Sequence, residues 1–340
     1  MAAYTTNPYV EAVADELDLF STPPTFTGVE KFYYVNYRPT SQITTDTSPV
    51  EFNISNQGID YIDLQRTKLY VRAKITKSDG KSLVEDEQVA PVNLWLHSLW
   101  SQVDLTLNGK LVTSSSNLYP YKSYHKRILN ASNDTKQSSL QAQLYYKDDG
   151  DSDETNPIAG INSGLVHRNT YSKMSKSVDM QGSLCEDFMD INRYLLNGVS
   201  LQLKLYPTRQ KFNLMSGQTG LDYKVVLQDV YLTVCKGRPS MNIITRHARM
   251  LGETTAKYPF TNKVVVCLVS AEAANGNYTK KPFNFAMYDV NGESLPSQPL
   301  SLSSGQIVTA YERLFEGREH LGSDITRYNF SMGSRWNQNT

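Results

Sequence analysis

The sequence predicts a mainly β protein built as an antiparallel sandwich or jelly roll. Three observations support this prediction: several segments alternate apolar and polar residues with a period of two, long polar loops separate them, and amphipathic helical patterns are short and few. Strands that alternate with long helices would instead indicate a parallel α/β sheet. The 22 tyrosines favour the same class, because tyrosine suits strand surfaces that are half buried and half wet.

Residues 1–30 are predicted to form an N-terminal arm, because they show little period-two signal and Pro23-Pro24 ends their one weak helical pattern. Strand segments then follow in chain order. Apolar or β-branched side chains recur through each of them: 32–37, 69–75, 103–108, 199–205, 226–234 and 264–269. Asn108-Gly109 is expected to form a hairpin turn, because this pair tolerates the positive φ angles of such turns.

Three short helices are predicted inside the connections between strands. The first covers residues 92–100, whose apolar side chains are spaced as one helical face, and the others cover 119–129 and 186–194. The length of 340 residues suggests two domains, and the last long strand ends at Gly237-Arg238-Pro239. We therefore expect a first domain at 31–240 and a second at 241–340.

Charge and hydropathy exclude two classes of partner. The 34 basic and 34 acidic residues cancel, whereas strong sequence-independent binding of nucleic acid needs a basic face or tail. No apolar run approaches the ~18 residues that a membrane-spanning helix requires. The first residues, Met1–Thr6, lack the basic and apolar regions of a secretory signal, so we expect an intracellular protein that is not secreted.

We expect no catalytic, cofactor-binding or metal site and therefore no enzyme. Cys185, Cys235 and Cys267 are too far apart to indicate a disulfide framework or a zinc site. Cys185 has no base or oxyanion turn near it in the sequence, so a buried thiol is favoured over a nucleophile. The five histidines are scattered singly, without the spacing of zinc ligands: His97, His125, His167, His247 and His320.

Two charged segments have ordinary explanations. Asp149–Asp153 is similar to the opening of a calcium loop, but the sixth and twelfth positions hold Glu154 and Gly160 instead of glycine and glutamate. A solvated surface loop is favoured over a weak cation site. Residues 122–127 form a small basic patch beside two tyrosines, and the end of a surface helix is favoured over a nucleic-acid contact.

Eleven stretches, in order along the chain, carry a resemblance to one family. They are Leu17–Pro24, Pro49–Phe52, Tyr61–Leu64, Leu69–Ile75, Pro91–Asp104, Leu107–Gly109, Val178–Met180, Leu195–Val199, Thr255–Pro259, Asn275–Tyr278 and Asn284-Phe285. The sharpest is Pro91–Asp104. Together they resemble the capsid-type protein of Polinton (Maverick) elements and adintovirus-like viruses.

The resemblance implies a double jelly-roll major capsid protein of the adenovirus-hexon lineage. In that family two jelly rolls stand side by side in one chain, and three chains form a pseudo-hexagonal capsomer of an icosahedral shell. It implies self-association, contact with other capsid proteins such as a penton protein, a location in the virion and no catalytic residue. Zero net charge suits such a shell protein. We expect tyrosine-rich loops and the helices at 92–100 and 119–129 to supply its contacts.

The length departs from that family. A complete jelly roll needs roughly 90–150 residues, and about 100 remain after residue 240. We therefore expect an incomplete second jelly roll, as in a shortened copy resident in an animal genome. The alternative interpretation is a β-sandwich binding module of the lectin or adhesin type. A cupin-type enzyme is disfavoured, because it would need clustered metal ligands and the histidines are isolated.

Overall fold

Two antiparallel four-stranded sheets face each other across one core. The computed structural model describes residues 28–40, 48–114, 116–149, 153–218, 220–253, 268–283 and 285–286. One sheet has the order β1-β10-β3-β7 and the other β2-β8-β5-β6. The strands of the sandwich are β1 (Val29–Tyr37), β2 (Val50–Ile54), β3 (Tyr61–Lys77), β5 (Trp100–Leu107), β6 (Lys110–Leu111), β7 (Val178–Gly182), β8 (Leu201–Pro207) and β10 (Tyr223–Pro239). The chain is thus mainly β, as the sequence predicts.

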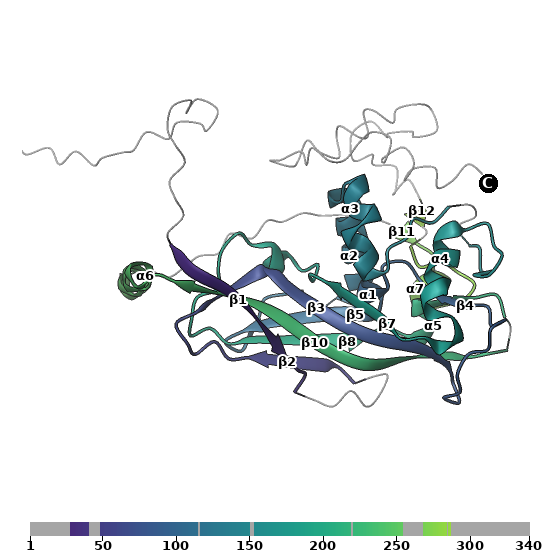
Figure 1. The fold of residues 1–340 in the computed structure, drawn as a ribbon, viewed down its shortest axis with the longest axis horizontal. Helices are drawn as coiled ribbons and strands as arrows, with labels where there is room; N and C mark the ends of the chain where they lie inside the picture. The colour runs from purple at the N-terminus through teal and green to yellow at the C-terminus, as the bar shows by residue number, and fades with distance from the viewer. Residues whose placement is uncertain are drawn as a thin grey trace, which may run out of the picture.

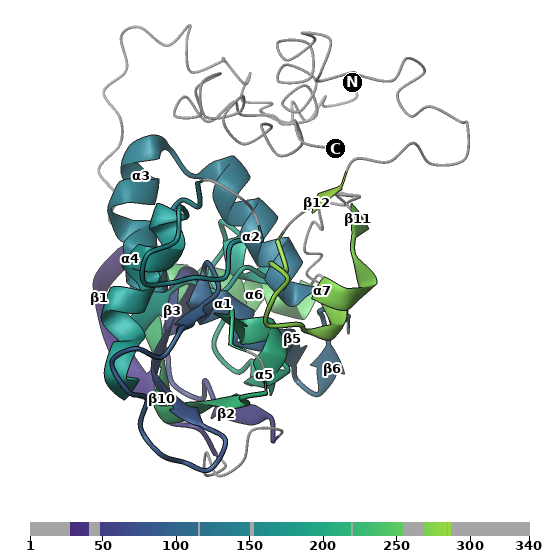
Figure 2. The same ribbon diagram turned by 90° about the vertical axis from the view of Figure 1, so that its right-hand side faces the viewer.

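The strand order is that of a jelly roll. Counted one to eight along the chain, the sandwich strands read 1-8-3-6 in one sheet and 2-7-4-5 in the other. The first and last strands are therefore neighbours, and the chain crosses between the sheets repeatedly, as two interlocked Greek keys require. Figure 1 shows the long strands β3 and β10 running the length of the sandwich, and Figure 2 views the same sheets turned by 90°.

The period-two pattern fixes which side chains face the core. In β3, Leu69, Val71, Ala73 and Ile75 are at most 1% exposed, while the residues between them, Tyr70, Arg72 and Lys74, are half buried or exposed. The facing sheet contributes buried leucines from β5 and β8. The predicted turn joins β5 to β6, where Asn108 has φ 46° and Gly109 has φ 79°. Positive φ at both central positions is the geometry for which this pair was predicted.

Short elements fill the connections. The helices are α1 (Trp95–Ser98), α2 (Tyr119–Asn130), α3 (Asn133–Gln137), α4 (Ser163–Ser172), α5 (Gln210–Asn213), α6 (Met241–Glu253) and α7 (Ala271–Asn275). The 3₁₀ helices are η2 (Ser139–Gln143), η3 (Lys173–Ser175) and η4 (Asp187–Asp190). Two small sheets pair β4 (Val89–Pro91) with β9 (Leu214–Ser216) and β11 (Leu268–Val269) with β12 (Phe285–Ala286). Figure 1 places α6 at one end of the sandwich and α4, α5 and α7 at the other.

The prediction of a helix at 92–100 is mostly wrong. Only Trp95–Ser98 is helical, because Leu94 before it has φ 51° and Trp100 after it already pairs with β8. Apolar residues recur through 92–100 because the rest of the chain buries this segment on every side. The prediction at 119–129 is confirmed by α2, whose second residue, Pro120, suits a helix start. The prediction at 186–194 reduces to the 3₁₀ helix η4.

Several predictions lie partly or wholly outside the described residues. These are the arm before residue 28, the strand residues 264–267 and most of the second domain. The division at residue 240 and the incomplete second jelly roll therefore stay predictions. Within the described part of the chain, none of the helices is both long and apolar enough to cross a membrane.

Candidate interaction surface

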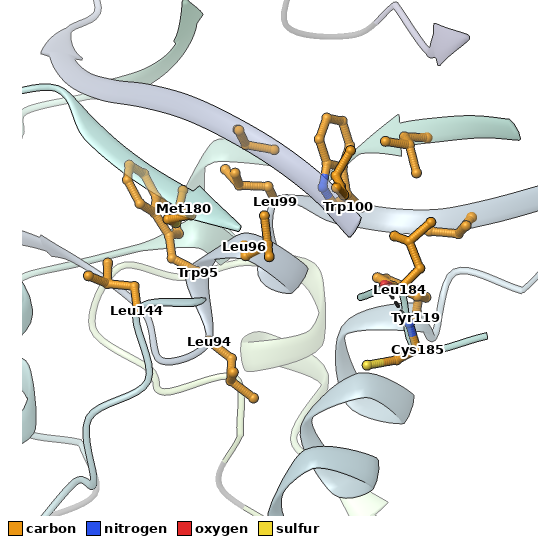
Figure 3. Close-up of a cluster of buried hydrophobic side chains, with 14 of the residues drawn as sticks. Leu94, Trp95, Leu96, Leu99, Trp100, Tyr119, Leu144, Met180, Leu184 and Cys185 are labelled. Carbon is orange, nitrogen blue, oxygen red and sulfur yellow. Dashed lines mark hydrogen bonds between the residues drawn. The ribbon is translucent and has the colours of Figure 1, made fainter. Parts of the chain in front are cut away.

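The segment with the sharpest resemblance forms the centre of the core. Figure 3 shows Leu94, Trp95, Leu96, Leu99 and Trp100 among side chains from β7 and the following loop. Both tryptophans are 0% exposed. The expectation that residues 92–100 supply a contact surface is therefore wrong, because this chain itself covers those side chains.

Helix α2 also faces inward. Tyr121 and Tyr124 are buried and contact two phenylalanines from other segments, Phe212 of α5 and Phe283 after α7. We call these four residues the cap aromatics. They are held together by one stacked and several edge-to-face ring pairs. The tyrosines of this helix are therefore packed within the chain, and a contact from the helix at 119–129 would fall to its partly exposed residues 125–130, so that expectation stays a prediction.

The basic patch of α2 is engaged within the chain. The ammonium of Lys122 lies 2.8 Å from Glu186 and 3.1 Å from Asp187. Lys126 pairs with Asp190, and Arg127 donates to the backbone carbonyl of Ser183 at 2.5 Å. The patch therefore ties α2 to the chain around η4, as expected for a helix surface and not for a nucleic-acid contact.

Cys185 and His97 form a buried pair, which raises the question of whether the histidine can act as a base for the thiol. The sulfur of Cys185 lies 3.8 Å from Nε2 of His97. Nε2 donates to Oε1 of Gln143 at 2.8 Å, and Nδ1 accepts from the Tyr119 hydroxyl at 3.0 Å. The nitrogen nearest the sulfur thus carries a proton already and cannot take one from the thiol.

The pKa values of the two groups also argue against a nucleophilic cysteine. Burial, together with the nearby Arg127, lowers the pKa of His97 to about 3, and burial raises the pKa of the Cys185 thiol. Both groups are neutral at physiological pH, whereas a cysteine nucleophile needs a thiolate. The pair is a structural element of the core, and sequence reasoning missed it because its members are far apart in the chain.

The other candidate groups are engaged in local structure. The ring of His167 stacks on Tyr146, and His247 of α6 stacks on Tyr61. His125 lies on α2, and His320 lies outside the described residues. Across the residues that the structure describes, no three His, Cys, Asp or Glu side chains are grouped to hold a metal ion.

The carboxylates that border the acidic loop have partners too. Asp149 accepts from the backbone nitrogen and hydroxyl of Ser163, where α4 begins, and Asp153 pairs with Lys280 at 3.0 Å. Residues 150–152 between them lie outside the described part. Cys185 and Cys235 are buried free thiols, and Cys267 lies outside that part as well.

Aromatic side chains that are half buried or exposed gather on the outer face of the sheet β1-β10-β3-β7. At its centre Tyr231 of β10 stacks on Tyr70 of β3 with ring centroids 4.3 Å apart. The guanidinium of Arg38 lies 5.4 Å from the Tyr231 ring and pairs with Asp229. The Tyr70 hydroxyl donates to Asp179 at 2.9 Å. Burial, and then this hydrogen bond, raise the pKa of Tyr70 to about 12.

The same face continues along the edge strand β1. Phe32 and Tyr34 are 37% and 57% exposed. Arg66 lies 4.8 Å above the Phe32 ring, and Tyr194 flanks that ring at 6.1 Å. We define the aromatic face as Phe32, Tyr34, Tyr70 and Tyr231 with the exposed arginines Arg38, Arg66 and Arg72. Tyrosine, phenylalanine and arginine are the residue types enriched at protein interfaces.

The outer face of the second sheet has a different character. Lys204 of β8 pairs with Glu51 of β2 at 2.8 Å, and Gln102 of β5 donates to Asp104 at 2.9 Å. Tyr206 is half buried on this surface. The polar side chains on this surface are already paired with one another. The aromatic face is therefore the stronger candidate for a partner.

A signal for the aromatic face was present in the sequence. Tyr70 and Arg72 occupy the positions that alternate with the apolar residues of β3, so they had to point away from the core. What the sequence did not reveal was that β10 and β1 place Tyr231, Phe32 and Tyr34 on the same side.

Known proteins provide three kinds of comparison. No protein-family model matches the chain. An uncharacterised protein of Caenorhabditis elegans is 27% identical over 331 residues, which covers 84% of this chain and 75% of that protein.

Solved structures are similar at a coarse level. A chain of the Sputnik virophage has a TM-score of 0.46 at 13% identity, and the Faustovirus major capsid protein has 0.46 at 9%. The mavirus major capsid protein has 0.36 at 12%. The matches cover 68%, 68% and 72% of this chain, but it spans only about half of those longer chains, 53%, 58% and 52% respectively.

Proposed function

We propose that this chain is a structural protein of a viral-type capsid, which trimerises into pseudo-hexagonal capsomers of an icosahedral shell. The observation that carries the proposal is the aromatic face, a surface of half-buried and exposed aromatic rings with exposed arginine side chains on a jelly roll. The resemblance of eleven ordered stretches to a capsid family supports it from the sequence. A relic encoded in an animal genome would keep the same surface.

The position of the face suits a ring of copies. A ring is closed by heterologous contacts, in which one patch of each copy meets a different patch of the next. The aromatic face extends from the edge strand β1 across β10 to β3, so it can receive a neighbour without rearrangement of the core. Aromatic rings there would be desolvated by the partner while Arg38, Arg66 and Arg72 form its polar surroundings.

The proposal includes the organisation and surroundings of the chain. The residues before β1 act as an arm, residues 31–240 form the first jelly roll, and residues 241–340 belong to the second. The protein resides in the virion and, before assembly, inside the cell. Its partners are other copies and other capsid proteins such as a penton protein. Zero net charge leaves the packaging of nucleic acid to basic proteins.

Two other functions occur on the same architecture. Jelly rolls also serve as lectins and as cupin-type enzymes. A cupin holds its metal inside the barrel, but here the two sheets enclose Phe52, Val71, Leu105 and Leu203, all at most 1% exposed. A lectin- or adhesin-type module remains the alternative and would act as a monomer or small oligomer that binds glycans.

Electron microscopy of the purified full chain tests the proposal. We expect particles of trimer size at micromolar concentration, and larger rings or shells as the concentration rises. A glycan array on the same sample tests the alternative. A strictly monomeric protein at every concentration would contradict the capsid function, and a monomer that retains specific glycans would support the binding module instead.

A further inference from the structure

A buried carboxylate outside the aromatic face joins three distant segments. Oδ2 of Asp148 lies 2.7 Å from the ammonium of Lys281 and 3.2 Å from the side-chain nitrogen of Asn93, while Oδ1 lies 2.8 Å from the guanidinium of Arg168. Arg168 comes from α4, Asn93 precedes α1, and Lys281 follows α7. The four side chains are almost completely buried.

Two cations and a carboxylate meet in this cluster. Burial alone would raise the pKa of Asp148, but Arg168 and Lys281 hold it well below its usual range, so the group is a carboxylate. Burial lowers the pKa of Lys281 in spite of its contact with Asp148. The carboxylate of Asp153 also acts on Lys281 and raises its pKa, so two carboxylates and two cations share this region, and ionised groups that are buried there are costly to keep.

The Asn93 side chain is polarised in a particular way. Its oxygen Oδ1 accepts hydrogen bonds from the backbone nitrogens of Leu94 at 2.9 Å and Tyr146 at 3.1 Å. Two backbone donors on one carbonyl oxygen are the arrangement that stabilises a tetrahedral oxyanion. Leu94 supports it with a left-handed backbone at φ 51°, an uncommon conformation for a leucine.

A nucleophile, a proton carrier and an activated amide therefore meet at one oxygen. Nζ of Lys281 and Nδ2 of Asn93 both contact Oδ2 of Asp148, so the carboxylate reaches both the attacking and the leaving nitrogen. Water is excluded, because Asn93 is 2% and Lys281 3% exposed. Fixed geometry of this kind replaces a bimolecular encounter by a reaction within one chain.

We propose that Lys281 and Asn93 join in an intramolecular isopeptide bond, with Asp148 relaying the proton. Asp148 takes a proton from the Lys281 ammonium, and the freed Nζ attacks Cγ of Asn93. The developing charge on Oδ1 is held by the two backbone N–H groups. As the oxyanion collapses, Asp148 returns the proton to Nδ2 and the Cγ–Nδ2 bond breaks. Nζ keeps one of its two remaining protons as the new amide N–H, and the other leaves with the ammonia as ammonium. No oxidant or cofactor is required.

The product removes one buried charge. An amide between Nζ and Cγ is neutral, so Asp148 and Arg168 remain as a one-to-one pair. The bond also ties the segment 268–283 covalently to the jelly roll. Tyr278, which accepts the Tyr223 backbone N–H at 3.1 Å, and Phe283 already anchor that segment without a covalent bond.

Mass spectrometry of the denatured full chain decides the question. We expect an intact mass lower than that of the sequence by one ammonia, and a protease digest in which the peptides of Asn93 and Lys281 are joined. Full sequence mass with two separate peptides would overturn the proposal. Loss of ammonia without the joined peptide would also overturn it, because a succinimide at Asn108-Gly109 gives the same mass.

Two variants test the roles of Lys281 as nucleophile and Asp148 as proton carrier. Lys281→Met removes the nucleophile and Asp148→Asn removes the proton carrier, so both should restore the full mass. Lys280→Met is the matched control: this neighbouring lysine is 41% exposed and pairs with Asp153, and its loss should leave the joined peptide intact. A joined peptide that persists in Lys281→Met would contradict the assignment, and the wild-type digest decides even if a variant does not fold.

Discussion

Two groups of aromatic residues use the same side chains in opposite environments. The cap aromatics Tyr121, Tyr124, Phe212 and Phe283 are buried between α2, α5 and the segment after α7. The rings of the aromatic face lie on the outside of a sheet and are half buried or exposed. The difference teaches that a high tyrosine content does not distinguish core from interface. The element that carries each ring makes that distinction.

The two groups of aromatic residues contribute to two different free energies, that of folding and that of association. Burial of the cap aromatics contributes to the free energy of unfolding of a single chain. Rings on the aromatic face contribute little to folding, and under the proposed function they gain their burial when a partner covers them. Substitutions in one group should therefore affect stability, and substitutions in the other should affect association.

The largest effect on stability is expected at the cap. Phe283 is 0% exposed, and its ring lies on Tyr124 with centroids 4.3 Å apart. Phe283→Ala should lower the free energy of unfolding by about 3–5 kcal/mol, since it leaves a cavity in a packed cluster. Urea denaturation measures the change. Phe32→Ala on the aromatic face is the matched control and should cost under about 1 kcal/mol; equal losses would contradict the comparison.

A pH-dependent effect is expected from the buried His97 of α1. Its pKa is about 3 in the folded chain and 6.5 when unperturbed. Between these values the unfolded chain binds a proton that the folded chain does not, so stability falls as pH falls, by about 1.4 kcal/mol per pH unit at most. His97→Gln should remove this component.

The measurement is the difference in unfolding free energy between wild type and His97→Gln from pH 7 to pH 4. We expect it to shift in favour of the variant as the pH drops below about 6.5. A difference that is constant over this range would show that His97 is protonated equally in both states.

A small effect on stability is expected on the aromatic face. Tyr70→Phe removes one hydroxyl, whose bond to Asp179 is exposed to solvent. Because water can replace an exposed partner, the free energy of unfolding should change by no more than about 0.5 kcal/mol. Thermal unfolding of the two proteins checks this. A loss as large as that of Phe283→Ala would place Tyr70 in the folding core.

Local patterns allowed much of the fold to be predicted. Alternation in 69–75 and 226–234 identified the two long central strands, and Asn108-Gly109 identified the hairpin, because both signals depend on neighbouring residues. The helix at 92–100 failed because burial on every side imitates the spacing of an amphipathic helix. Apolar spacing reports burial, and only the surrounding segments decide the backbone conformation.

The sites could be predicted less well, because they depend on contacts between distant segments. His97 contacts Cys185, which lies 88 residues further along the chain, and Asp148 contacts Lys281 of the segment that follows α7. Tyr231 and Tyr70 become neighbours through the register of β10 on β3. Single-sequence patterns carry no information on such pairings.

The native mass of three proteins tests the central claim, that the aromatic face mediates self-association. Wild type, the double variant Tyr34→Ser/Tyr231→Ser and the control Tyr206→Ser on the opposite sheet would be compared by light scattering at equal concentration. We predict trimers or larger species for wild type and control, and monomers for the double variant with nearly unchanged stability. A double variant that associates like wild type would contradict the account.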